Sequence, residues 1–260
     1  MLQVADSSTQ ADELSCLAGI VILAGGASKR MGSPKAELIL PTGERLLDYH
    51  VRQALELSAA MMSNMPIMLA DNGRGFSINP NLIKSSKSSI FHIRDYLSAN
   101  ALSSKDISGK NLSNKDDKSI ETGGALVAIE SALQSLKRLA SSNPLTKDAS
   151  WQQSWLLVIS CDSLIPVTDL WQKLQPYITQ AADKSVICLT DDSHLYPLLG
   201  LYRVSIEPDL KRYIDDGQRQ VMKFIKPIVQ PVAFVKKWQN LTNFNTPKDF
   251  ASACLALNNL

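Results

Sequence analysis

A continuous apolar run near the start of the chain leads directly into a glycine-rich basic loop. Residues Leu17–Ala24 read LAGIVILA, and the loop up to Lys35 reads GGASKRMGSPK. A strand that is apolar at nearly every position is typical of a parallel sheet covered by helices on both faces. Ligands of such sheets bind beyond the carboxyl ends of the strands. The sequence therefore predicts an anion site immediately after its first strand.

The rest of the chain continues the alternation of strands and helices, which predicts an α/β fold with a mainly parallel sheet. Further strands are expected at Pro66–Ala70, Ile90–Ile93, Trp155–Ser160, Val186–Leu189 and Leu198–Tyr202. Helices are expected at Leu46–Ala60, Gly123–Leu139, Asp169–Gln180 (interrupted at Pro176), Asp209–Asp215 and Val221–Ile225. A last helix is expected to begin at Thr246, with Thr246 as N-cap, Pro247 next and Asp249 in the first turn.

The polar stretches suggest one domain with additions. Residues 1–16 are polar and lack the pattern of a secretion signal, so we expect a disordered leader before a single domain at 17–260. Residues 98–120 are rich in Ser, Asn, Lys and Asp, and are expected to form a flexible surface insertion, with a substrate-binding loop as the alternative. A second polar connection is expected near 140–154.

Composition excludes several function classes. The net charge of +2 is too small to favour nucleic acid as the main partner. The sequence has no run of about 18 apolar residues, the length that a membrane span requires. Four cysteines without a C-x-x-C pair, together with three histidines, disfavour a structural zinc site and suggest reduced thiols. We therefore expect a soluble cytoplasmic protein.

The glycine loop does not match the two commonest phosphate-binding motifs. Both G-x-x-x-x-G-K-[ST] and G-x-G-x-x-G are absent. Glycines at the end of a strand still allow backbone N–H groups to approach an anion closely. Arg30 and Lys35 add the positive charge that neutralises a triphosphate.

The glycine loop resembles that of a known family. The pattern Leu-Ala-Gly-Gly-x-Ser-x-Arg-Met-Gly-x-x-Lys is similar to the nucleotidyltransferase signature of the molybdenum cofactor guanylyltransferases and their α/β relatives. Three later segments also resemble that family: SCDS at 160–163, GQRQVMKF at 217–224 and NFNTPKD at 243–249. The resemblance spans residues 17–253. It implies a Rossmann-like three-layer αβα sandwich, the fold of the nucleotide-diphospho-sugar transferases.

The resemblance also implies a reaction and its residues. The family transfers GMP from GTP to molybdopterin-bound molybdenum cofactor, releases pyrophosphate and uses Mg²⁺. Carried over to this chain, Arg30 and Lys35 are the phosphate cations and Asp162 is the metal ligand. The implied nucleotide-binding residues are Leu23, Ala24, Gly25, Gly26, Lys35, Asp95 and Asp162. From the residues alone, Asp162 is otherwise a turn or N-cap aspartate, and Asp95 is otherwise a turn aspartate.

The second substrate is assigned by weaker matches. Arg219 and Lys223 are candidates for the pterin phosphate, with a plain surface pair as the alternative. Asn243 and Asn245 are candidates for phosphate or metal, with a cap of the last helix as the alternative. The family resemblance also suggests transient contact with molybdoenzymes or with cofactor-synthesis proteins.

The chain departs from the family at several positions. Leu69 stands where the family often has an asparagine, and Tyr196 stands where it often has a histidine. The Arg-Arg pair of the family is replaced in this chain by Arg219–Gln220. Three alternatives stay open: a cytidylyltransferase of the same cofactor, a sugar-phosphate nucleotidyltransferase, and a non-catalytic nucleotide- or cofactor-binding relative. The second glycine, Gly26, favours guanine, because relatives that use CTP usually carry alanine in place of Gly25.

Overall fold

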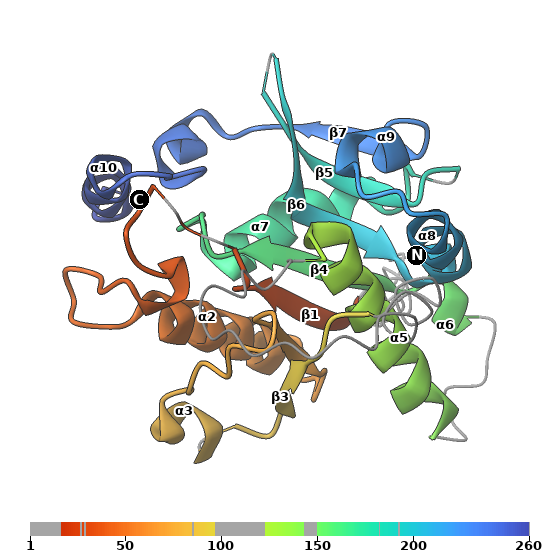
Figure 1. Ribbon diagram of the computed structural model, residues 1–260, viewed down its shortest axis with the longest axis horizontal. Coiled ribbons are helices and arrows are strands. Elements are labelled where there is room, and N and C mark those ends of the chain that lie inside the picture. Colours follow the sequence, from red (N-terminus) through yellow and green to blue (C-terminus); the bar gives the residue numbers. More distant parts are fainter. Residues whose placement is uncertain are drawn as a thin grey trace, which may run out of the picture.

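The computed structural model describes residues 17–26, 28, 30–84, 86–96, 123–142, 150–181, 183–191 and 193–259. The expected leader and the expected insertion at 98–120 lie outside the described residues. A seven-stranded sheet forms the centre, in the order β3-β2-β1-β4-β6-β5-β7, with helices on both faces (Figure 1). The strands are β1 Leu17–Leu23, β2 Ile67–Ala70, β3 Ile90–Ile93, β4 Trp155–Ser160, β5 Val186–Thr190, β6 Leu195–Arg203 and β7 Val229–Ala233.

The sheet is mainly parallel, which confirms the predicted fold class. The strand β1 pairs in parallel with β2 and β4, and β5 pairs in parallel with β7. The exception is β6, which runs antiparallel between β4 and β5. Only residues 191–194 separate β5 from β6, and so short a link closes a hairpin rather than a parallel crossover.

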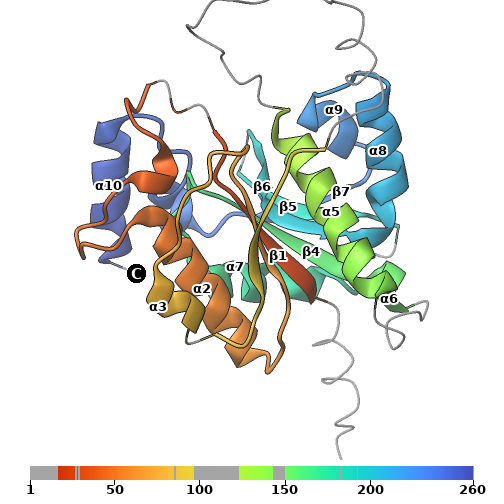
Figure 2. The ribbon, with the colours of Figure 1, turned by 60° about the horizontal axis from the view of Figure 1, so that its bottom comes forward.

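Two helical layers cover the sheet (Figure 2). The helices are α2 Leu46–Ala60, α3 Pro80–Lys84, α5 Ala125–Ser141, α6 Ser150–Gln153, α7 Val167–Leu174, α8 Glu207–Asp215, α9 Val221–Ile225 and α10 Pro247–Leu257. Side chains of β1 alternate between two cores. Ile20 and Ile22 lie in the core that includes residues of α2 and α7, and Val21 lies in the core that includes residues of α5 and α8. The apolar run of β1 is thus explained by burial on both sides.

Several element boundaries differ from those expected. The helix expected at 169–180 is α7 followed by a separate 3-10 turn, Gln175–Tyr177, which contains Pro176. The polar connection near 140–154 is partly helical, since α5 reaches Ser141 and α6 follows. The strand β7 was not predicted, because its sequence, VQPVA, contains a proline that disfavours a strand.

The last helix begins as predicted. The Thr246 hydroxyl accepts from the backbone N–H of Asp249 at 3.2 Å, and the Asp249 carboxylate accepts from the backbone N–H of Thr246 at 3.0 Å. This reciprocal capping box fixes the segment that precedes α10. None of the helices in the described part of the chain is long and apolar enough to cross a bilayer.

Candidate active site

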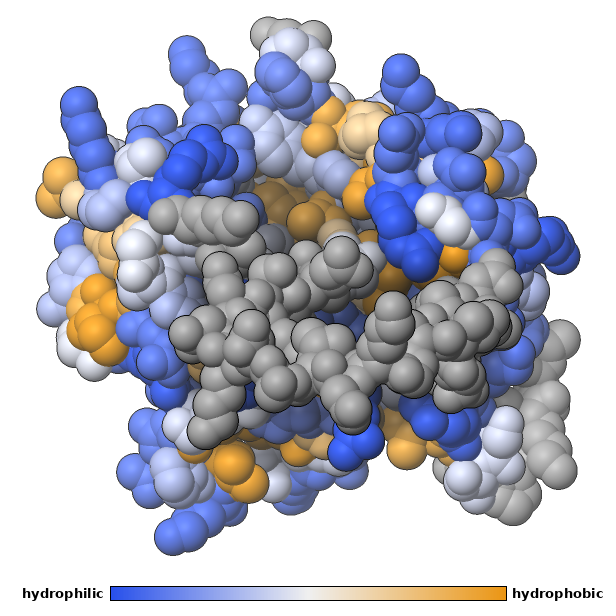
Figure 3. Space-filling model, in the orientation of Figure 1, coloured by the Kyte–Doolittle hydropathy of each residue, from blue (hydrophilic) through white to orange (hydrophobic). Residues whose placement is uncertain are grey.

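A cavity of about 450 Å³ lies at the carboxyl ends of the central strands, beside the start of α5. Its size suits a small-molecule ligand. The space-filling view in Figure 3 shows this face hollowed, with apolar side chains visible inside the hollow. All of the residues expected to bind nucleotide line the cavity, as does Arg30: Leu23, Ala24, Gly25, Gly26, Arg30, Lys35, Asp95 and Asp162. Segments more than 100 residues apart in sequence therefore meet where the glycine loop predicted a ligand.

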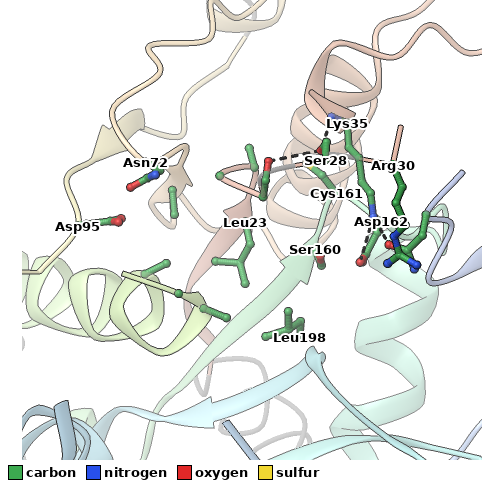
Figure 4. Close-up of a pocket in the computed structure, with 18 residues that line it drawn as sticks. Leu23, Ser28, Arg30, Lys35, Asn72, Asp95, Ser160, Cys161, Asp162 and Leu198 are labelled. Atoms are coloured by element: carbon green, nitrogen blue, oxygen red, sulfur yellow. Dashed lines mark hydrogen bonds and ion pairs between the residues drawn. The ribbon is translucent and has the colours of Figure 1, made fainter. Parts of the chain in front are cut away.

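One end of the cavity, which we call the cationic end, consists of Arg30, Lys35, Asp162 and Asn245. The ammonium Nζ of Lys35 lies 3.1 Å from Oδ1 of Asn245 and 3.6 Å from Oδ2 of Asp162. Arg30 points toward the same end in Figure 4. The Asp162 side chain keeps 31% of its surface exposed. Two positive charges and one accessible carboxylate thus face a common space.

The loop that carries Asp162 is held on both sides by backbone contacts. It follows β4, and the N–H of Cys161 donates to the Leu23 carbonyl at 3.1 Å, which ties it to the glycine loop's strand. Past Asp162, the N–H of Leu164 donates to the Leu241 carbonyl at 2.7 Å. The Tyr49 hydroxyl of α2 donates to the Leu164 carbonyl at 3.0 Å. These bonds restrict where the carboxylate points.

The orientation of the Asn245 amide is also fixed. Its nitrogen Nδ2 donates to the backbone oxygen of Asn243 at 3.0 Å and to Oδ1 of Asn243 at 2.9 Å. Its oxygen is therefore left to accept from Lys35. Since Thr246 and Asp249 cap α10, the side chain of Asn245 is free of the capping role that was the alternative for it. Asn243 contributes by holding Asn245 and does not itself line the cavity.

The opposite end of the cavity, which we call the amide end, carries Asn72 and Asp95 (Figure 4). The amide nitrogen of Asn72 is buried and has no hydrogen-bond partner among the described residues. Asp95 is half-buried, and burial raises the pKa of its carboxyl, with the nearby Asp71 acting in the same direction and a backbone hydrogen bond from Gly123 opposing them. Two polar side chains thus line this end of the cavity.

Sequence reasoning missed Asn72 because it looked for an amide at Leu69. Leu69 is fully buried within β2, whereas Asn72 follows the strand and faces the cavity. The signal in the sequence was the turn Asp71–Asn72–Gly73 itself, because asparagine tolerates the left-handed φ of 56° that Asn72 adopts there. A Cβ added at Gly25 would lie 3.0 Å from the Cβ of Asn72, so a glycine suits the close approach of the two loops.

The wall between the two ends is lined with small and apolar residues. These are Leu23, Ala70, Gly124, Ala125, Ala128 and Leu198. Gly124 has a φ of 81° and forms the N-cap of α5, so no side chain covers the start of that helix. Small side chains leave room for a flat ring to lie against the wall. The cavity thus combines an apolar middle with different polar groups at each end.

The structure does not bring Arg219 and Lys223 to this cavity. One guanidinium nitrogen of Arg219 donates to the carbonyls of Ile214 and Gln218, each at 2.7 Å, at the end of α8. The ammonium of Lys223 lies 3.3 Å from the Gln218 side-chain oxygen. These contacts fit the surface pair that was their alternative.

The donor set at the cationic end suits one hard cation. Within the described residues, no group of three or more His, Cys, Asp or Glu is arranged to hold a metal. A single accessible carboxylate such as Asp162 is nevertheless the protein ligand that Mg²⁺ takes when phosphates and water supply the rest. The neighbouring Cys161 is no nucleophile, because burial raises the pKa of its thiol far above the usual range.

Comparison with known proteins first shows which class of domain the chain resembles. Residues 20–70 match the model of the MobA-like NTP transferase domain. The whole fold is that of the nucleotidyltransferases. A molybdopterin-guanine dinucleotide biosynthesis protein A from Archaeoglobus fulgidus superposes with a TM-score of 0.56 at 16% identity, covering 93% of this chain and 100% of that one. A 4-diphosphocytidyl-2C-methyl-D-erythritol synthase from Anaerococcus prevotii superposes with a TM-score of 0.54 at 11% identity, covering 93% and 98%.

Particular relatives are found by sequence. The chain is 30% identical over 100 residues to molybdenum cofactor guanylyltransferases of Yersinia pestis and Yersinia pseudotuberculosis. This similarity covers 36% of this chain and 48% of those relatives, so the match spans about half of their length. The matched region includes most of β1, the glycine loop, α2 and β2. Residues of the glycine loop and of the ends of β1 and β2 line one side of the cavity.

Proposed function

We propose that the protein transfers GMP from GTP to molybdopterin-bound molybdenum cofactor and releases pyrophosphate. The observation that carries the proposal is the meeting of Lys35, Asp162 and Asn245 at one end of a nucleotide-sized cavity. These residues come from three separate segments of the chain. A solvated lysine and a turn aspartate would have no reason to converge with a third segment.

The reaction needs positioning and charge neutralisation more than a protein nucleophile. A terminal phosphate oxygen of the pterin attacks the α-phosphorus of GTP and forms a new P–O bond. The bond from that phosphorus to the oxygen bridging to the β-phosphate breaks, and pyrophosphate leaves with the electron pair. Lys35 and Arg30 lie at the end where this negative charge is held, so their cations stabilise it.

Asp162 is the residue that would hold Mg²⁺, which, when bound, neutralises phosphate charge. Lys35 currently pairs with Asp162 and Asn245, and a triphosphate oxygen would replace one of these partners. Because Asn245 is itself fixed by Asn243, Lys35 keeps a fixed support while it binds phosphate.

The amide end favours guanine over cytosine. Guanine presents a carbonyl oxygen beside N–H donors. The buried N–H group of Asn72 is a donor that lacks a partner, and the Asp95 carboxylate is an acceptor. A base with one acceptor and adjacent donors satisfies both groups. Cytosine can also meet both groups, but its single amino donor gives the carboxylate one hydrogen bond, where the adjacent N1–H and N2–H2 of guanine give two.

The pterin would enter from the cationic end, because its phosphate must reach the α-phosphorus. Arg219 and Lys223 remain candidates for its phosphate only if they leave their present backbone and side-chain partners. Receipt of the product by molybdoenzymes, and contact with cofactor-synthesis proteins, belong to the same proposal.

The proposal is tested by incubating the protein with Mg²⁺ and molybdenum-loaded molybdopterin, and with GTP, CTP or UTP in separate reactions. Pyrophosphate release is followed in each. We expect release with GTP above that with the other two. Release with CTP alone would show a cytidylyltransferase instead. Tight binding of Mg²⁺-nucleotide without any release would show a non-catalytic nucleotide-binding relative.

A further inference from the structure

An arginine outside the cavity links the two loops that border it. The guanidinium Nη1 of Arg74, in the loop after β2, donates to the backbone carbonyl of Gly26 at 2.9 Å. Gly26 lines the cavity and so does Asn72, but Arg74 does not. The bond therefore joins the loop that carries the amide end to the glycine loop.

The loop that carries Arg74 is rigidly organised by a buried carboxylate. Asp71 is 2% exposed. Its carboxylate accepts from the backbone N–H groups of Gly73 and Phe76, each at 3.1 Å. Its Oδ2 also lies 2.9 Å from Nδ1 of His92 on β3. The Arg74 guanidinium lies 6.0 Å from the centre of the Phe76 ring. Arg74 thus extends from a loop whose conformation is fixed, and its guanidinium can hold a more loosely packed segment in place.

The glycine loop is that more loosely packed segment. Gly26 is exposed, and a Cβ added there would meet nothing within 4 Å, so packing does not hold this peptide in place. Its carbonyl is held by hydrogen bonds, from Arg74 and, at 3.4 Å, from the Ser28 hydroxyl. The same hydroxyl oxygen accepts from the backbone N–H of Lys35 at 3.2 Å. The position of the Gly26 carbonyl is thereby linked, through the Ser28 hydroxyl, to the backbone of Lys35.

We infer that Arg74 is a positioning residue for nucleotide binding. It fixes the Gly26 peptide relative to the loop after β2, and so sets the distance between the glycine loop and Asn72 and supports the placing of Lys35. This inference rests on the proposed function, since it concerns the same cavity. Without Arg74 the glycine loop samples more conformations, and a nucleotide must order it on binding, which weakens the affinity.

The test compares Arg74→Ala with Arg74→Lys and with Arg212→Ala, an exposed arginine on α8 that serves as matched control. Binding of Mg²⁺-GTP is measured by calorimetry, and KM and kcat are measured by pyrophosphate release. We expect Arg74→Ala to raise both the Kd and the KM roughly three- to tenfold, the range that one hydrogen bond to a cation supports. The value of kcat should stay within about twofold, because no group that faces the phosphates is removed.

Two readouts separate positioning from a general loss of structure. Guanidinium ion at millimolar concentration should restore the affinity of Arg74→Ala and leave that of Arg212→Ala unchanged. Arg74→Lys should lie between the wild type and Arg74→Ala. An unchanged Kd and KM in Arg74→Ala would overturn the inference, and so would a lowered melting temperature with no change in affinity. Failure of the wild type to bind any Mg²⁺-nucleotide would instead overturn the proposed function itself.

Discussion

The two ends of the cavity differ in how their polar groups are satisfied. At the cationic end, Lys35 already has Asp162 and Asn245 as partners. At the amide end, the buried nitrogen of Asn72 has no partner among the described residues. A buried donor without a partner costs more than a paired one gains. The cationic end is thus preassembled by contacts within the chain, and we propose that the amide end selects the base of the nucleotide.

The largest expected effect comes from removing the carboxylate of the cationic end. Asp162→Asn should lower kcat by about 100-fold or more, because metal binding and charge neutralisation are lost together. Pyrophosphate release at saturating GTP measures this change. Asp183→Asn serves as control, since that side chain is 81% exposed and pairs only with Lys184 in the described structure. Full turnover by Asp162→Asn would remove Asp162 from the metal site.

The amide end should change the choice of nucleotide rather than the rate. Asn72→Leu keeps the size of the side chain but removes its donor, so the preference for GTP over CTP should fall about tenfold in kcat/KM. The value of kcat with GTP should change much less than in Asp162→Asn. Competition between GTP and CTP in one reaction measures the preference. If the preference stays as in the wild type, base selection does not depend on Asn72.

A third prediction concerns the support of Lys35. Asn245→Ala removes the oxygen that accepts from Nζ, and should lower kcat/KM about three- to tenfold. The same change made together with Lys35→Met should add almost nothing, because Asn245 acts through Lys35. The value of kcat/KM is measured for the wild type, the two single variants and the double variant, which together form a double-mutant cycle. Simple additivity of the two effects would separate Asn245 from Lys35.

The smallest predicted effect is a pH dependence at the amide end. Since burial raises the pKa of Asp95, its carboxylate is protonated at a higher pH than an ordinary aspartate. Mg²⁺-GTP affinity should therefore decline on acidification earlier than free GTP titration alone explains. The folded state also binds this proton more tightly than the unfolded state, so the free energy of unfolding should fall as pH rises from about 3.8 toward the raised pKa.

Calorimetric titration of Mg²⁺-GTP across this pH range measures the affinity, and Asp95→Asn supplies the reference without the titrating carboxyl. The difference between wild type and Asp95→Asn should shrink on acidification, as the two side chains become alike in charge. A difference that is constant over the range would show that Asp95 does not meet the nucleotide in its ionised form.

The sequence was sufficient for the features that depend on local pattern. The apolar run of β1 predicted burial on both faces, and Thr246, Pro247 and Asp249 predicted where the last helix begins. The glycine loop predicted a ligand site, because a strand that ends in glycines and cations has few other uses. Lys35 and Asp162 came from the family resemblance, and the structure brings them to within 3.6 Å.

Features that depend on contacts between distant segments could not be predicted from the sequence. No local pattern shows that Lys35 meets Asn245, which lies 210 residues further along the chain. Asn72 was passed over because its importance comes from a loop folding back onto Gly25, rather than from a strand position. Arg219 suited an anion site by residue type, yet its guanidinium is taken up by backbone carbonyls of its own neighbourhood.

The contact between Lys35 and Asn245 has a consequence for the order in which the protein becomes competent during synthesis. A ribosome-bound chain that has released residues up to 240 already contains the glycine loop, the Asp162 loop and all seven strands of the sheet. It still lacks the Leu241 carbonyl that holds Leu164 and the amide that supports Lys35. Such a nascent chain would have a nearly complete fold but an incomplete site, and we expect it to bind nucleotide more weakly until the segment with Leu241 and Asn245 emerges.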